Sequence, residues 1–164
     1  MPRVLFDHIQ LQGSAGFIAR TQAALVCLRT APCHAEVWGA LGVLRKAKRS
    51  GVDACQGVPL IDFGKKTWTS PTIWYASGIG HEGFHIKLYR EAKLGSGRHW
   101  SDANTIGAIK EAVEEEKKCL EFQLRVLLEL NAEDWYLEHV REGIKSPDYL
   151  GDPFSLKDYL RRNW

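Results

Sequence analysis

The sequence has no long apolar stretch. Among its 164 residues, no run approaches the roughly 18 consecutive apolar residues that a membrane helix needs. Residues 1–16 also lack the continuous apolar segment of a secretory signal. We therefore expect a soluble protein that does not contact membranes and that is made and kept in the cytoplasm. The sequence offers no test of a further possibility, delivery as an effector.

Neither charge nor cysteine dominates the composition. The formal net charge is only +2, and the most basic run, RKAKR at 45–49, is typical of the solvated end of a helix. We therefore expect no nucleic-acid partner. The four cysteines, Cys27, Cys33, Cys55 and Cys119, contain no CxxC pair, which argues against a disulfide framework and against a structural zinc knuckle. Free buried thiols are the expectation.

Helical periodicity is what the sequence has in quantity. The apolar fraction of 45% and the charged fraction of 26% are those of an ordinary globular protein. Apolar residues recur at three- and four-residue spacing through most of the chain, and one short β-rich run is bounded by glycines. We predict helices over 16–31, 34–50, 73–93, 107–131, 133–143 and 155–162, a strand within 57–64 and a loop over 95–105. The predicted fold class is α+β, mostly α, with a small β-sheet.

The predicted elements are expected to form one domain over residues 1–164, a length that can bury a sizeable core. Within it we distinguish a core at 57–131, an N-terminal helical hairpin at 16–50 and a C-terminal helical tail at 133–164. The sequence contains neither an internal repeat nor a low-complexity tract that would indicate a second unit.

His81, Glu82 and His85 stand at H-E-x-x-H spacing in the stretch HEGFH. On a helix, positions i and i+4 lie one turn apart on one face, so both imidazoles can point at one ion. Glu82 lies about 100° further around the axis, where it can reach a water on the ion without being a ligand. Two histidines on a helix are also often ordinary polar residues on its surface. Apolar residues before and after the motif nevertheless predict a buried helix, and buried ionisable groups need partners. We expect one Zn²⁺ per chain.

Three glycines, Gly78, Gly80 and Gly83, interrupt the same predicted helix. Each weakens a helix by about 1 kcal/mol relative to alanine. Such a cluster indicates that another backbone, or a ligand, comes close to this helix.

Glu116 is the predicted third ligand. When the apolar residues of the long helix at 107–131 are placed at about 100° per residue, the centre of the apolar face falls almost on Glu116. Glu111 and Glu114 point further away, and acids in this half of a helix are favoured by its dipole. Glu115 remains the alternative ligand. Gln123, two turns along the same face, is either a hydrogen-bonding partner of the ligands or a satisfied core amide.

The motifs HEGFH at 81–85 and EKKCLEFQ at 116–123 resemble those of gluzincin metallopeptidases, and most closely the compact minigluzincins. The resemblance covers roughly residues 57–131. It implies a metallopeptidase whose glutamate ligand comes from a second helix. It also implies a small sheet whose edge strand runs beside the active-site helix, and residues 58–63 are the candidate for that strand.

This chain departs from the resemblance at several positions. Thermolysin-like relatives have an aspartate four residues after the glutamate ligand, and this chain has Leu120 there. Many such peptidases stabilise the oxyanion with a downstream His or Tyr. Tyr136 and His139 are candidates only because they lie downstream, and a structural role is the simpler account of each. The short chain leaves little room for a deep substrate cleft.

Two functions of different class follow from these residues. The first is a zinc metallopeptidase that acts on a peptide or protein substrate, with Glu82 activating a water on the zinc. The second is a non-catalytic zinc-binding domain, or a binding module whose peptidase activity is lost or latent. A purely structural site needs no base and is usually closed by a fourth protein ligand, for which His99 is the candidate. The sequence defines neither the substrate preference nor the oligomeric state.

Overall fold

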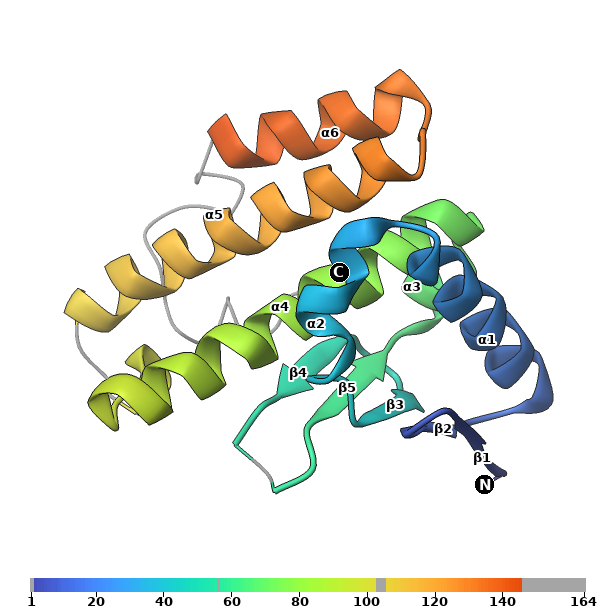
Figure 1. Ribbon diagram of the computed structural model, residues 1–164, viewed down its shortest axis with the longest axis horizontal. Coiled ribbons are helices and arrows are strands. Elements are labelled where there is room, and N and C mark those ends of the chain that lie inside the picture. Colours follow the sequence, from blue (N-terminus) through green and yellow to red (C-terminus); the bar gives the residue numbers. More distant parts are fainter. Residues whose placement is uncertain (1, 56, 103–105, 146–164) are drawn as a thin grey trace.

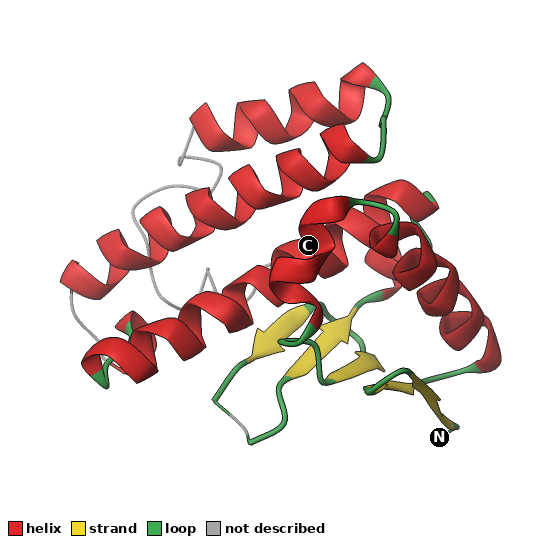
Figure 2. Cartoon of the chain, viewed as in Figure 1, coloured by secondary structure: helices red, strands yellow, loops and turns green. Residues whose placement is uncertain are grey.

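The computed structural model describes residues 2–55, 57–102 and 106–145, and these residues form an α+β fold dominated by helices, as predicted (Figures 1 and 2). The strands are β1 (Arg3–Phe6), β2 (Ile9–Gln12), β3 (Val43–Lys46), β4 (Gly51–Asp53) and β5 (Leu60–Phe63). The α-helices are α1 (Ala15–Arg29), α2 (Ala35–Trp38), α3 (Lys65–Trp68), α4 (Thr72–Ser96), α5 (Ile106–Glu129) and α6 (Asp134–Lys145). Two 3₁₀ turns, η1 (Pro32–His34) and η2 (Trp100–Asp102), complete the described elements.

The strands form a mixed sheet in the order β1-β2-β3-β5-β4. Strands β2, β3 and β5 are parallel, while β1 and β4 pair antiparallel at the two edges. Leu11, Leu44 and Ile61 are register partners across the three parallel strands, and all three are fully buried. Because side chains alternate across a strand, this row marks the face of the sheet that packs on the main core.

The predicted helix over 34–50 is wrong beyond its first turn. Only η1 and α2 are helical there, and the chain then extends into β3 and β4. The backbone of Gly42 approaches Pro59 so closely that a Cβ at Gly42 would lie 2.6 Å from the Pro59 carbonyl oxygen. The hairpin predicted over 16–50 is therefore a helix followed by strands. The apolar pattern of these residues suits a helix or a strand, and the pairing of β3 with β2 and β5 decides for the strand.

The strand predicted within 57–64 exists as β5, but it is not an edge strand. It lies between β3 and β4. The edge beside the long helix α4 is β4, a strand just beyond the predicted helix over 34–50 that was not predicted. The two strands of the N-terminal hairpin, β1 and β2, were not predicted.

The long helices form successive layers above the sheet. In Figure 1 the sheet, α4, α5 and α6 follow one another from bottom to top, and α4 packs on α5 as α5 packs on α6. The helices predicted over 73–93, 107–131 and 133–143 correspond to these three elements. The helix predicted over 155–162 lies outside the described residues. None of the helices that the structure describes is long and apolar enough to cross a membrane.

The start of α4 is fastened to α1. Pro71 precedes its first turn, and the Arg20 guanidinium donates to the carbonyl oxygens of Trp68, at 2.9 Å, and of Ser70. Inside the core, the hydroxyl groups of Thr21 and Tyr75 lie 2.9 Å apart within hydrogen-bonding distance. The axial position and the rotation of α4 are thus fixed near the beginning of the helix.

Two of the glycines in α4 mark close packing, as expected, although side chains rather than a backbone or ligand approach them. A Cβ at Gly80 would lie 3.3 Å from atoms of Phe122 and Val126, and one at Gly83 would lie 3.0 Å from Leu41. A Cβ at Gly78, in contrast, would meet no atom within 4 Å. One face of α4 therefore packs tightly against its neighbours.

Candidate metal centre

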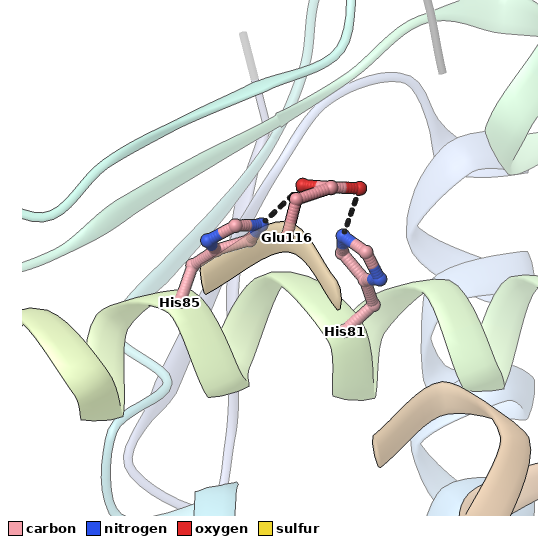
Figure 3. A group of neighbouring side chains, drawn as sticks. All are labelled: His81, His85 and Glu116. Carbon is pink, nitrogen blue, oxygen red and sulfur yellow. Dashed lines mark hydrogen bonds and ion pairs between the residues drawn. The ribbon is translucent and has the colours of Figure 1, made fainter. Parts of the chain in front are cut away.

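His81, His85 and Glu116 meet between α4 and α5 (Figure 3). His81 and His85 rise from the same face of α4, with ring centroids 5.0 Å apart, because four residues make about one helical turn. Glu116 reaches between them from α5. Its Oε1 lies 3.4 Å from His81 Nε2 and its Oε2 lies 3.1 Å from His85 Nε2. Among the described residues, these three form a group whose ligand atoms all lie within 4.8 Å of one another.

The donor atoms fit a divalent metal ion. Two neutral imidazole nitrogens and one carboxylate oxygen make up a common catalytic zinc set, in which a fourth position stays open. Each imidazole lies close to a different oxygen of Glu116, at 3.4 and 3.1 Å, and one ligand atom from each residue lies within 4.8 Å of the other two. The sequence prediction of these three residues thus corresponds to a buried group able to hold one ion.

Burial of the group leaves its charges in need of compensation. The side chains of His81 and His85 are each 7% exposed and that of Glu116 is 3% exposed. Burial alone would raise the pKa of Glu116, but the neighbouring His81 and His85 outweigh it and hold that pKa well below its usual range. Glu116 Oε1 has no hydrogen-bond partner within the described part of the chain. An ion between the three side chains would satisfy this oxygen.

Glu82 stands beside this group without belonging to it. It is only 7% exposed, and burial raises its pKa, with an opposing effect from His81 and His85. A carboxylate next to two imidazoles, made more basic by its surroundings, has the properties of a proton acceptor. Its position one residue after His81 places it about 100° further around the axis of α4, and it is not a member of the ligand group.

A cavity of about 100 Å³ opens next to Glu82 and His81. This volume is several times the roughly 10–15 Å³ that a cavity needs to hold one water, so it has room for several water molecules or for one amino-acid side chain of medium size. It is lined by Phe63, Thr67, Trp74, Gly78, His81, Glu82, Leu120, Gln123, His139, Val140 and Gly143. Apart from Glu82, none of these lining side chains carries a carboxylate. The walls are mostly apolar. Through His81 and Glu82, the cavity borders the group formed by His81, His85 and Glu116.

Glu115, the alternative ligand, lies on the other side of His85. Its Oε1 is 2.9 Å from His85 Nδ1, and its Oε2 is 2.7 Å from His99 Nε2. Burial would raise the pKa of Glu115, but His85 and His99 outweigh it and lower the pKa. Glu115 therefore contacts the ring nitrogen that points away from Glu116. His99, considered as a fourth ligand, is bonded to Glu115 and is not a member of the group.

The remaining predicted site residues divide between the cavity and the α5–α6 interface. Gln123 and His139 line the cavity, and Gln123 also donates to Ser77 Oγ at 3.2 Å. Tyr136 stacks on Trp74 with ring centroids 5.5 Å apart and packs in the apolar cluster between α5 and α6. Of the two candidates for the oxyanion, His139 is thus the one that lines the cavity.

The cysteines are free thiols, as predicted, but they differ in burial. Cys33 and Cys119 are buried, Cys27 is half-buried, and Cys55 is exposed, against expectation. Cys119 follows Glu116 by one turn of α5, and burial raises its pKa to about 11 despite an opposing effect from His85. Cys119 is therefore a neutral thiol beside the metal group and differs from the thiolates that bind zinc.

Sequence reasoning did not assign the contact from Glu115 to His85, or the part of the cavity wall that comes from α6. The contact from Glu115 to His85 could have been predicted, since a metal-ligating histidine usually donates its other ring N–H to a carboxylate or carbonyl. The α6 part of the cavity wall depends on the packing of α6 against α5, which the sequence does not indicate. In comparisons with known proteins, no family model matches the chain, and no curated protein or solved structure shows significant similarity to it.

Proposed function

We propose that this chain is a zinc-dependent metallopeptidase of the gluzincin type, in which His81, His85 and Glu116 hold the zinc. The observation that carries the proposal is the position of Glu82, a buried carboxylate next to the ligand group and on the wall of a cavity. A metal that only stabilises the fold needs no such base at the edge of an open space.

Each residue has a distinct part in the proposed reaction. Zinc at such a site supplies Lewis acidity, which polarises a carbonyl group and acidifies water. Glu82 accepts a proton from the attacking water and donates it to the amine that leaves when the C–N bond breaks. The water oxygen becomes part of the new carboxylate, so hydrolysis of one peptide bond consumes one water and regenerates Glu82.

The cavity supports a substrate with an uncharged side chain. Trp74, Leu120 and Val140 offer apolar contact to a side chain that enters the cavity. Leucine and phenylalanine residues beside the scissile bond are therefore the first choice for a library of fluorogenic peptides.

The decisive experiment uses Glu82→Gln, which keeps the size of the side chain but cannot accept the proton. Zinc content, measured by mass spectrometry of the metal, and the thermal midpoint should stay near wild type. Hydrolysis of the responsive peptides should fall by about 10²–10⁴-fold. Glu91→Gln is the matched control on the same helix, because Glu91 is exposed and pairs with Lys87. A Glu82→Gln protein as active as the control would contradict the proposed role.

One observation favours a second candidate, a zinc site that only holds α4 against α5. All three ligand side chains are nearly inaccessible, the most exposed at 7%. In that case wild type and Glu82→Gln would both bind zinc and be stabilised by it, and both would be inactive on every peptide. Peptide hydrolysis by the wild type at a rate that depends on Glu82 would exclude this candidate.

A further inference from the structure

A series of hydrogen-bonding contacts leads from His85 away from the proposed metal. His85 Nδ1 lies 2.9 Å from Glu115 Oε1, Glu115 Oε2 lies 2.7 Å from His99 Nε2, and His99 Nδ1 lies 2.8 Å from Ser101 Oγ. An ionised carboxylate can only accept hydrogen bonds. Both imidazoles must therefore donate to Glu115, which places a proton on His85 Nδ1 and on His99 Nε2.

This arrangement determines which nitrogen of His85 is free for a metal. With its proton on Nδ1, the neutral ring has its lone pair on Nε2, the atom that faces Glu116 Oε2 at 3.1 Å. Rotation of the ring about its axis would break the contact with Glu115. Glu115 thus fixes both the tautomer and the orientation of one proposed ligand.

The far end of the series is itself held in place. The His99 side chain is only 6% exposed and lies against the Tyr89 ring, with centroids 4.9 Å apart. The His99 backbone N–H donates to Asp102 Oδ2 at 2.8 Å, and Lys93 at the end of α4 pairs with the same carboxylate. Residues 97–102, which follow α4, therefore present His99 to Glu115 in a fixed position.

We propose that Glu115 and His99 are positioning residues that hold His85 as an Nε2 ligand, an inference that rests on the proposed zinc site. Leu120 occupies the place where thermolysin-like peptidases have an aspartate, and here it is 8% exposed and packs in the cluster between α5 and α6. The residue before the glutamate ligand supplies the acceptor in its place. In this chain the orienting carboxylate and the ligating carboxylate are neighbours on α5.

The test compares zinc affinity in Glu115→Ala, Glu115→Gln and the matched control Glu114→Ala, whose parent side chain is exposed. Competition with a chromophoric chelator should show about 10–100-fold weaker binding in Glu115→Ala. Glu115→Gln keeps one acceptor oxygen and should lie between Glu115→Ala and wild type. The control should stay within about twofold of wild type, since the Glu114 side chain is exposed and does not belong to the ligand group.

Two spectroscopic measurements separate positioning from a general loss of structure. In the zinc-loaded protein, a ¹H–¹⁵N spectrum of the histidine rings should show a protected Nδ1–H for His85 that disappears in Glu115→Ala. The visible absorption of the cobalt-substituted protein should change in Glu115→Ala and stay unchanged in Glu114→Ala. His99→Phe keeps an aromatic ring against Tyr89, and it should weaken zinc several-fold even if Glu115→Ala fails to fold.

The outcomes distinguish this inference from the proposed function. Equal zinc affinity and equal cobalt spectra in wild type, Glu115→Ala and His99→Phe would overturn the inference and leave the zinc site intact. A His85 ring with its proton on Nε2 would overturn it as well. A wild-type protein that binds no zinc would overturn both proposals. Weakened zinc in the variants, beside a wild type that hydrolyses no peptide, would support the positioning role and count against the peptidase.

Discussion

Helix α4 has two buried faces that are built by opposite means. On one face, Gly80 and Gly83 let apolar side chains from α1, α2 and α5 approach closely, and this face needs nothing beyond packing. On the other face, His81 and His85 meet Glu115 and Glu116 across the interface with α5. Buried charges recover their desolvation cost only when the geometry is favourable and every polar atom is satisfied. The stability contributed by the polar face therefore depends on what its charged groups bind, whereas the stability contributed by the apolar face depends on packing alone.

The largest effect should come from removing a ligand on the polar face. In Glu116→Ala, the two histidines lose the only carboxylate in the group. Zinc affinity should therefore fall by more than the about 10–100-fold expected for an outer partner such as Glu115. Zinc at 100 times its dissociation constant stabilises a folded protein by about 2.7 kcal/mol, and chemical unfolding with and without zinc should show this increment in wild type and not in Glu116→Ala. Zinc retention in Glu116→Ala, with loss in Glu115→Ala, would mean that the ligand has been chosen wrongly.

Thiol labelling should distinguish the polar face of α4, near Cys119, from the main core, which contains Cys33. Exposed Cys55 should react first with a maleimide, before the buried Cys33 and Cys119. Burial, with a further contribution from Glu129, raises the pKa of Cys33 to about 12, so only about 10⁻⁴ of it is thiolate at pH 8. We expect chelation of zinc to accelerate labelling of Cys119 at the polar face and not of Cys33 in the main core. Mass spectrometry of the labelled peptides measures both rates, and equal acceleration at the two sites would show that zinc stabilises the whole molecule uniformly.

A smaller effect is expected at the apolar face, where glycines can be compared within one helix. Alanine at Gly83 would place a Cβ 3.0 Å from Leu41 and 3.2 Å from Val37. Overpacking of this kind costs about 1–3 kcal/mol, partly offset by about 1 kcal/mol of improved helix propensity. Gly78→Ala meets no atom within 4 Å and should gain that propensity without the cost.

Urea unfolding of these two variants should therefore separate them by about 1–3 kcal/mol, with Gly83→Ala the less stable. Both should keep the full zinc increment, since neither alanine touches a ligand. If Gly83→Ala were as stable as Gly78→Ala, the close packing of this face would not limit the stability of the protein.

The sequence predicted the long helices because their apolar periodicity extends over many turns. It failed for residues 39–53, where a few apolar residues suit a helix or a strand and where contact with β2 and β5 decides the outcome. Leu41 and Leu44 stand three residues apart, a spacing that suits one face of a helix, and both are buried, although Leu44 lies in a strand. Burial could be read locally at these positions, while the kind of element could not.

The candidate metal group was predictable because its parts are local. The spacing of His81 and His85 fixes their relation within one helix, and the apolar face of α5 pointed to Glu116. The contact of Glu115 with His85 and His99 depends on the rotation of α5 relative to α4 and on the path of residues 97–102 after α4. Neither is encoded in the periodicity of a single helix, so the sequence could only rank Glu115 below Glu116.

Because the start of α4 is held by contacts with α1, the number of residues between Pro71 and His81 is constrained. Arg20 and Pro71 fix where the helix begins, and His81 follows ten positions after Pro71. One inserted residue between them would turn both histidines by about 100°, away from α5. Seven inserted residues would leave them only about 20° from their present direction. Relatives that keep the histidines and Glu116 should therefore keep the length of this segment or vary it by whole heptads.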